Sequence, residues 1–535
     1  MDWGLNVAGR KGIVAIVGLV TAALLARPAL ADEAKGRWIR AESPHFTVYG
    51  DVTSTALKEY VVKLERYDGL LRYLHGMPLD GEAVRKLPIY LVVSRSGFDT
   101  VIPGLSDGVG GFYVPSPNDV FAVAWRQKES DHVIQHEYVH HFMLRYFPYG
   151  YPAWLTEGYA EYFGSAVIDE NKIQVGRNAM RGENLRNGPW VSMEKLLSKR
   201  PFELSGTEPS MFYAQAWLLT HYFMSDPKRY EQLQAYMKAV GGGADPIKAM
   251  TEITGMAPGK LQVELRGYMM GALKFTDYTV SNLPTPEIKL SPMPPAADDL
   301  LLVSQGLRRA GLFGADEEVD EDAPGATAKR IAEYKQQMKD WGLALLTQAR
   351  RGAERYPDAP IARLTLARAE LTYGDRETGL KLADAYAAAH PDDPEGFELA
   401  GLGRMAIGDR DPARREALYK EAGLKLGQAF KLDPERFQTL YGYALSRRLD
   451  PKYPSDNVLN VLDEAHMLAP QVPEITLTEA EALIARGQND KAAVLLKPVA
   501  NSPHGGKAAK QAKALLQKIG GEAPTSETDS KESGQ

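Results

Sequence analysis

The sequence lacks cysteine altogether, since none occurs among its 535 residues. Disulfide bonds, cysteine-ligated zinc or iron–sulfur sites and thiol catalysis are therefore excluded. An excess of basic charge is also lacking, because the chain has 69 acidic and 63 basic side chains and a formal net charge of −6. A mildly acidic chain binds phosphate backbones poorly, so we expect no nucleic acid among its partners.

Long apolar runs are missing as well, apart from one at the N-terminus. Arg10 and Lys11 precede an uncharged apolar run over residues 12–26, and the small-residue sequence ALA ends at Ala31. This order of parts is typical of a secretory signal peptide over residues 1–31, with an uncleaved N-terminal anchor as the alternative. We therefore expect export, to a bacterial periplasm in view of the missing cysteines, and no membrane span after signal cleavage.

Residues 32–278 combine two kinds of hydrophobic periodicity, which predicts a mixed α+β domain. Alternating or short apolar runs indicate strands, and apolar residues at helical spacing indicate amphipathic helices. The expected strands cover residues 36–50, 87–93 and a hairpin over 107–124, and the expected helices cover residues 54–76, 129–147, 152–165 and 210–224.

After residue 337 the pattern is helical throughout, and its prolines are periodic. From Pro357 to Pro503 they recur at intervals of 34, 43, 36 and 33 residues. A period of 34 residues is that of the tetratricopeptide repeat, in which helix pairs stack into a solenoid. We expect an all-α solenoid of this kind over residues 337–520, with a non-repeating helical bundle as the alternative.

Two segments of unusual composition flank this helical region. Five prolines fall within residues 283–295, and six of the seven residues at 316–322 are acidic. Proline-rich and highly charged stretches are typical of linkers, so we expect a linker over residues 279–336. The polar residues 521–535 are expected to form a disordered tail.

The strongest chemical signal is the sequence HEYVH, which runs from His136 to His140 inside an expected helix. Two histidines one turn apart lie on the same face of a helix, so both imidazoles can reach one metal ion. Glu137 lies about 100° further around the helix axis. There it can act as base toward a metal-bound water without binding the metal itself. The spacing therefore predicts a zinc site.

A catalytic zinc ion needs a third protein ligand. The extended motif HExxHxxGxxH is absent, because Met143 and Tyr146 occupy its glycine and last histidine positions. A carboxylate from the next expected helix is the other option, and Glu157 is the candidate, with Glu161 one turn later. Glu161 could accept the outer N–H of a ligating histidine and so fix its tautomer. A solvated helix face is the alternative for both carboxylates.

Together, HEYVH and the later sequence PAWLTEGYAEYF resemble the gluzincin class of zinc metallopeptidases, in particular the peptidase-MA-like families, over about residues 131–163. The resemblance implies a zincin-like domain in which His136, His140 and Glu157 bind zinc and Glu137 is the general base. It does not imply aminopeptidase activity, because no signature for binding a substrate N-terminus is evident.

A shorter resemblance concerns the sequence MFYAQA at residues 211–216, which is similar to the tyrosine-bearing helix of aminopeptidase-type gluzincins. It implies that Tyr213 donates its hydroxyl to the oxyanion of the tetrahedral intermediate. His221 is the rival donor, and a structural place in the helical core is the alternative for Tyr213.

Two functions of different class follow from these observations. The first is an exported zinc metallopeptidase that hydrolyses peptide bonds and whose repeat domain docks the peptide or protein substrate or a protein partner. The glycine-rich hairpin at residues 108–113 would offer it an edge strand for an extended substrate. The alternative is a tetratricopeptide-repeat scaffold protein whose metallopeptidase-like domain is catalytically idle. The intact Glu137 favours the enzyme, since an idle site needs no base.

Overall fold

The computed structural model describes residues 38–81, 83, 85–105, 110–126, 132–279, 283, 285–312, 327–502 and 506–520. The expected signal peptide at 1–31 and the expected tail at 521–535 lie outside the described residues, as does the acidic run at 316–322. Within the described part of the chain, no helix is both long and apolar enough to cross a membrane.

Six strands form one mixed sheet in the order β4-β5-β3-β2-β1-β9. The β2–β3 and β3–β5 pairs are parallel and the other pairs are antiparallel. One edge of the sheet is β4, which belongs to the expected hairpin. The strands are β1 (Ile39–Glu42), β2 (Phe46–Gly50), β3 (Leu87–Val92), β4 (Gly111–Pro115), β5 (Val120–Trp125) and β9 (Lys289–Pro292).

Helices cover both faces of this sheet, which explains why its central strands are apolar at nearly every position. Alternate residues of β3 enter two cores, because successive side chains of a strand point to opposite faces. Ile89 joins the core made with α1 (Ser54–Leu74) and α3 (His132–Tyr146). Tyr90 joins the core made with α2 (Arg95–Val101) and α11 (Ala296–Ala310).

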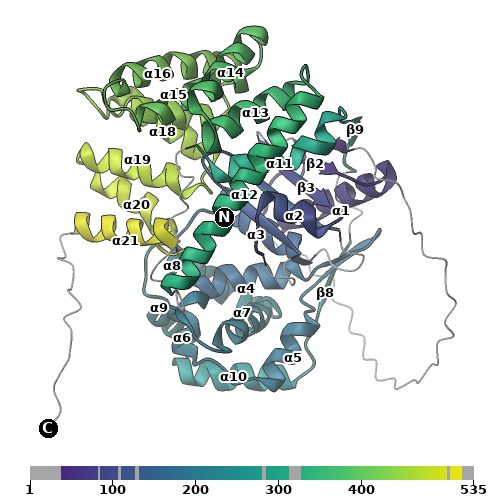
Figure 1. Cartoon of the computed structure of the whole chain (residues 1–535). Helices are drawn as coiled ribbons and strands as arrows, with labels where there is room; N and C mark the ends of the chain where they lie inside the picture. The colour runs from purple at the N-terminus through teal and green to yellow at the C-terminus, as the bar shows by residue number, and fades with distance from the viewer. Residues whose placement is uncertain are drawn as a thin grey trace.

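A helical layer follows α3 and lies beside the sheet (Figure 1). Its central member, α4 (Ala153–Gly164), packs between α3 and α7 (Glu208–Met224). The remaining elements of this part are β6 (Val167–Ile168), β7 (Lys172–Val175), α5 (Ala179–Asn187), α6 (Met193–Ser198), η1 (Pro201–Glu203), α8 (Pro227–Gly241), α9 (Pro246–Thr254), α10 (Pro258–Met270) and β8 (Thr276–Thr279). Strands β6, β7 and β8 form a small second sheet.

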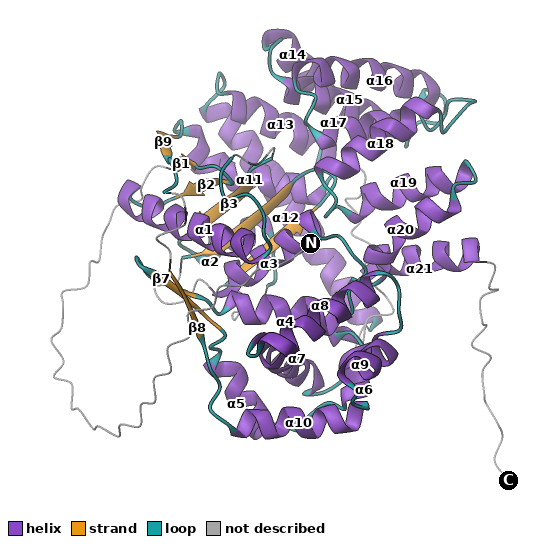
Figure 2. Ribbon diagram, turned by 180° about the vertical axis from the view of Figure 1, so that it is seen from behind, coloured by secondary structure: helices purple, strands orange, loops and turns teal. Residues whose placement is uncertain are grey.

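The C-terminal part is a helical solenoid, in which each helix packs on its neighbour along the chain (Figure 2). The prediction of an all-helical repeat region is thereby confirmed at the level of architecture. The helices are α12 (Ala328–Arg355), α13 (Pro360–Tyr373), α14 (Arg376–Ala389), α15 (Pro394–Gly408), α16 (Arg415–Leu432), α17 (Phe437–Ser446), α18 (Asp456–Leu468), α19 (Pro473–Ala485), α20 (Asn489–Ala500) and α21 (Gly506–Gly520).

The structure differs from the expected linker over residues 279–336. Within it, β9 adds an edge strand to the main sheet beside β1, and α11 packs against α2, α12 and α13. The prolines that suggested a linker are compatible with both elements. An edge strand tolerates proline, as at Pro292, and the start of a helix tolerates it too, as at Pro295.

The solenoid also packs against the sheet domain rather than standing apart from it. Phe437, Leu468 and Ile475 belong to the same hydrophobic core as α1 and α3. The Nη1 atom of Arg145, in the last turn of α3, donates hydrogen bonds to the carbonyl oxygens of Met467 and Leu468 at 2.6 and 2.9 Å. Helices α17 to α19 are therefore held next to the helix that carries HEYVH.

Candidate metal centre

Helix α3 presents the two histidines of HEYVH in the same direction. The Nε2 atoms of His136 and His140 are 3.1 Å apart. Glu157 comes from α4, and its Oε2 lies 3.4 Å from Nε2 of His136 and 3.6 Å from Nε2 of His140. The structure thus brings together the three residues expected to bind metal, and their ligand atoms form a compact triangle.

The size of this triangle fits zinc. Zinc binds imidazole nitrogen and carboxylate oxygen at about 2.0–2.1 Å in tetrahedral geometry, which places neighbouring ligand atoms about 3.3 Å apart. The three separations of 3.1, 3.4 and 3.6 Å surround that value. Three protein ligands leave the fourth position to water or substrate, which is the arrangement of catalytic rather than structural zinc sites.

Helix α4 explains why Glu157 reaches this position. All 12 residues of α4 are buried, because most of them are apolar and the helix lies between two other helices. Glu157 and Glu161 are 0% and 1% exposed, so the alternative of a solvated helix face is wrong. Burying a carboxylate is costly unless it is paired or binds a metal, which fits the two imidazoles found beside Glu157.

Two glycines allow α4 to approach its neighbours closely. A β-carbon at Gly158 would lie 2.4 Å from the carbonyl oxygen of Ala216 in α7, and one at Gly164 would lie 3.0 Å from the α-carbon of His136. Neither close approach was predicted from the sequence. The feature that could have indicated the first is the position of Gly158 directly after the ligand candidate Glu157.

Glu161 lies next to the ring nitrogen of His136 that does not face Glu157. Its Oε1 is 3.6 Å from Nδ1 of His136, too far for a hydrogen bond as the side chains stand. Arg181 of α5 donates hydrogen bonds to both oxygens of Glu161, at 2.6 and 2.9 Å, and Asn178 adds a third at 3.1 Å. No sequence motif indicated Arg181 or Asn178, which come from the turn and helix after β7.

These contacts set the protonation of the site. Burial alone would raise the pKa of Glu161, but the hydrogen bonds and charge of Arg181 lower it below its usual value. Burial alone would lower the pKa of His136, but the hydrogen bond and charge of Glu157 raise it above its usual value. Glu161 is therefore a carboxylate at neutral pH, suited to hold an imidazole N–H.

Glu137 is partly exposed and does not belong to the triangle. Its charge is close enough to contribute to the raised pKa values of His136, Tyr113 and Tyr213. It therefore lies beside the candidate metal position without occupying a ligand place, as the helix geometry of HEYVH predicts.

The structure places Tyr213 and His221 in different surroundings, although both are on α7. Burial and then the charge of Glu157 raise the pKa of Tyr213, so its hydroxyl stays protonated and can donate a hydrogen bond. Nδ1 of His221 lies 2.7 Å from the hydroxyl of Tyr268 in α10, and burial lowers the pKa of His221 to about 4. The charges that shift the pKa of His221 include none of the carboxylates around the triangle. Of the two candidate donors, only Tyr213 has a pKa that the charge of Glu157 raises.

The other histidines of α3 have partners of their own. Nδ1 of His132 lies 2.8 Å from the carbonyl oxygen of Gly164, and Nδ1 of His141 lies 2.9 Å from the hydroxyl of Tyr113. Burial lowers the pKa of His141 to about 3, so this imidazole is neutral at pH 7. Since Tyr113 is on β4, this contact ties the edge strand to the helix that carries the triangle.

A second cluster of His45, Glu65 and Asp68 could also hold a metal by proximity alone. Its oxygens are already used, however. Both Glu65 oxygens contact His45, at 2.9 and 2.8 Å from its backbone and ring nitrogens. The Asp68 oxygens accept from Arg72 and from Tyr138, each at 2.6 Å. This cluster is a hydrogen-bond network that ties α1 to the middle residue of HEYVH.

Comparisons with known proteins add little to this description. No protein-family model matches the sequence, and no curated protein matches it. Two solved structures are similar in part. A thermophilic TPR protein of Thermus thermophilus has a TM-score of 0.30 and 21% identity, over 35% of this chain and 94% of that chain. MamA has a TM-score of 0.24 and 14% identity, over 35% of this chain and 95% of that chain. Both TM-scores are below 0.5, so neither similarity supports a conclusion about the fold or function of this chain.

Proposed function

We propose that the chain is an exported zinc-dependent metallopeptidase that hydrolyses peptide bonds. The observation that carries this proposal is the triangle of two histidine nitrogens and one buried carboxylate oxygen, at separations suited to zinc. When bound there, zinc would polarise a substrate carbonyl and lower the pKa of a water molecule. The proposal of export rests on the signal-peptide pattern of the sequence.

The protein's own side chains then have distinct roles in the proposed reaction. Glu137 accepts the proton of the attacking water and passes it to the leaving amine. Tyr213, whose hydroxyl is protonated at neutral pH, donates a hydrogen bond to the oxyanion. Glu161, held ionised by Arg181, would orient His136 by accepting its Nδ1–H after a small shift of the side chains, which now stand 3.6 Å apart.

Peptide or protein substrates suit the surroundings of this site. Strand β4 is an edge of the main sheet and is tied to α3 through Tyr113 and His141. An extended peptide can add to such an edge by backbone hydrogen bonds, which places its peptide bonds beside the metal helix. The solenoid lies next to α3, where it would dock the substrate or a protein partner.

A second candidate function is a repeat scaffold with an idle N-terminal domain. The observation that favours it is the extent of the solenoid, which runs from α12 to α21 and offers a large surface for protein binding. In this case the triangle would bind zinc without any turnover.

The deciding experiment compares Glu137→Gln with wild type in the full exported chain. Zinc content, measured by atomic spectroscopy, should be about one per chain in both, because Glu137 is not a ligand. Hydrolysis of fluorescein-labelled casein should fall by a factor of about 10²–10⁴ in the variant. The matched control Glu231→Gln, an exposed position on α8, should keep full activity. Zinc binding without any chelator-sensitive hydrolysis in wild type would instead support the scaffold.

A further inference from the structure

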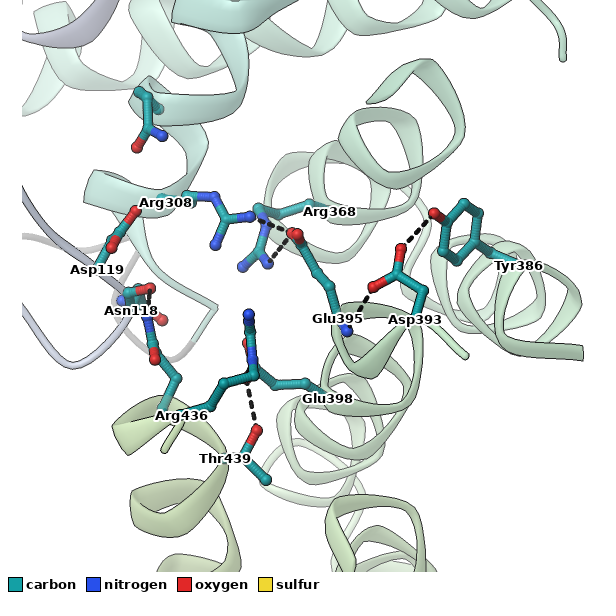
Figure 3. A network of polar contacts seen from close by, with 12 residues as sticks. Asn118, Asp119, Arg308, Arg368, Tyr386, Asp393, Glu395, Glu398, Arg436 and Thr439 are labelled. Carbon is teal, nitrogen blue, oxygen red and sulfur yellow. Dashed lines mark hydrogen bonds and ion pairs between the residues drawn. The ribbon is translucent and has the colours of Figure 1, made fainter. Parts of the chain in front are cut away.

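A cluster of buried charges, none of them a candidate metal ligand, lies where the sheet domain meets the solenoid (Figure 3). Side chains from the hairpin turn, α11, α13, α15 and the start of α17 converge there. We call it the arginine cluster, and it consists of Arg85, Arg308, Arg368 and Arg436 with the carboxylates of Asp119, Glu395 and Glu398.

The carboxylates of the cluster are shared unevenly among the arginines. Arg436 takes both oxygens of Glu398, at 3.1 and 3.2 Å, and Arg85 contacts Asp119 at 2.8 Å. Arg308 and Arg368 share a single oxygen of Glu395, and the Arg368 contact is long, at 3.5 Å. Among the described residues, the guanidinium of Arg368 has no other hydrogen-bond or ion-pair partner, although it carries five N–H donors.

The cluster therefore carries more positive than negative charge. It has four guanidinium groups, which stay protonated at neutral pH, and three carboxylates. The nearby carboxylate of Asp393 keeps its negative charge, but it forms no ion pair with these arginines among the described residues, and its oxygens accept from the Tyr386 hydroxyl at 2.6 Å and from a backbone N–H at 2.9 Å. The side chain of Arg368 is only 3% exposed, so water cannot easily compensate the excess.

The positions of two helix ends add positive potential at this place. Glu395 is in the first turn of α15 and Arg436 directly precedes α17, so the N-terminal ends of both helices are directed at the cluster. Burial and then the charge of Arg308 lower the pKa of Arg368 to about 10, whereas the neighbouring carboxylates raise the pKa values of Arg308 and Arg436 above their usual range, so Arg368 is the arginine whose charge is least compensated. In Figure 3 the guanidinium groups of Arg308, Arg368 and Arg436 point toward one another.

We propose that the arginine cluster is a binding site for a small oxyanion such as phosphate or sulfate. Arg308 and Arg368 would donate to the oxyanion with the N–H groups that Glu395 leaves unused, and Arg436 would contribute its charge. The bound anion would compensate the charge of Arg368 and join α11, α13 and the start of α17 through these three arginines. This inference does not depend on the proposed peptidase activity.

The test is calorimetric titration of the full chain with inorganic phosphate, in chloride buffer at constant ionic strength. We expect half-saturation at about 1 mM or below, and an unfolding temperature that rises with phosphate concentration. Arg368→Met should weaken binding about tenfold or more, the effect of losing a charged hydrogen bond. The matched control Arg350→Gln, on the exposed side of α12, removes an arginine paired with Glu370 and should leave binding unchanged.

Two readouts distinguish an anion site from a purely structural ion-pair network. In chloride buffer without phosphate, Arg368→Met should unfold at the wild-type temperature or above, because Glu395 keeps its pair with Arg308. No response of the wild type to phosphate beyond that to chloride would overturn the proposal, as would an equal response in Arg368→Met. The acidic run at 316–322 carries negative charge, as phosphate does, and would compete with it for the arginines. A variant with these acids changed to amides is therefore titrated beside the wild type. A phosphate response that occurs only in this variant would also overturn the proposal.

Discussion

The close approach of α4 and α7 at Gly158 gives a prediction whose size follows from the structure. In Gly158→Ala the new methyl group would lie 2.4 Å from the carbonyl oxygen of Ala216 and 2.5 Å from Oγ1 of Thr220. The first of these atoms is backbone and cannot turn away, so α4 and α7 must separate. Overpacking of this kind costs about 1–3 kcal/mol, and the backbone contact places it near 3 kcal/mol.

Alanine also has a better helix propensity than glycine, which returns about 1 kcal/mol. The net loss of stability is then about 2 kcal/mol, and the unfolding temperature should fall by about 4–8 °C. Separation of the helices also moves Glu157, the neighbour of Gly158 in the chain. Zinc affinity, measured by competition with a chelator, should therefore fall by about 10- to 100-fold, as for other residues that position ligands.

The matched control is Gly267→Ala on α10. A β-carbon at this exposed helical position would meet no atom within 4 Å, so the propensity gain stands alone. The control should be about as stable as the wild type or up to 1 kcal/mol more stable, with unchanged zinc affinity. If Gly158→Ala behaved like Gly267→Ala in both measurements, the close helix contact would not position the metal ligand, and the reasoning would be refuted.

Three further predictions concern the proposed site and the solenoid. Tyr213→Phe should lower kcat for casein hydrolysis by about 10²-fold or more with zinc content unchanged, and equal activity would exclude an oxyanion role. Removing zinc with a chelator should lower the unfolding temperature of the wild type but hardly that of Glu157→Ala, since ligand binding to the folded state stabilises it. Burial raises the pKa of Glu479 to about 8, so the folded chain keeps a proton that the unfolded chain releases above its usual pKa of 4.5. The free energy of unfolding should therefore fall as the pH rises from about 4.5 to 8. In thermal unfolding curves, Glu479→Gln should make this fall smaller, whereas Glu481→Gln, at an exposed neighbouring position, should leave it unchanged.

The local features of this protein could be predicted from its amino-acid sequence. The spacing of His136 and His140 places both imidazoles on one helical face whatever surrounds the helix, because the helical period is a property of the backbone. The strands at β3 and β5 and the helices of the solenoid follow from hydrophobic periodicity in the same way. The neutral state of Tyr213 and the partners of His221 do not follow, because they depend on burial by other helices.

Which distant residues meet could not be predicted, because it depends on how the helices and strands pack. Glu157 reaches the two histidines because α4 is buried between α3 and α7. Arg181 forms an ion pair with Glu161, and no sequence motif connects its helix α5 to Glu161. The prolines at 283–295 are equally compatible with a linker and with an edge strand followed by a helix, and the pairing of β9 with β1 selects the second. The arginine cluster could not be predicted from the sequence, because its charged side chains come from segments as far apart as Arg85 and Arg436. Burial and pairing depend on contacts between such segments, and local periodicity carries no information about them.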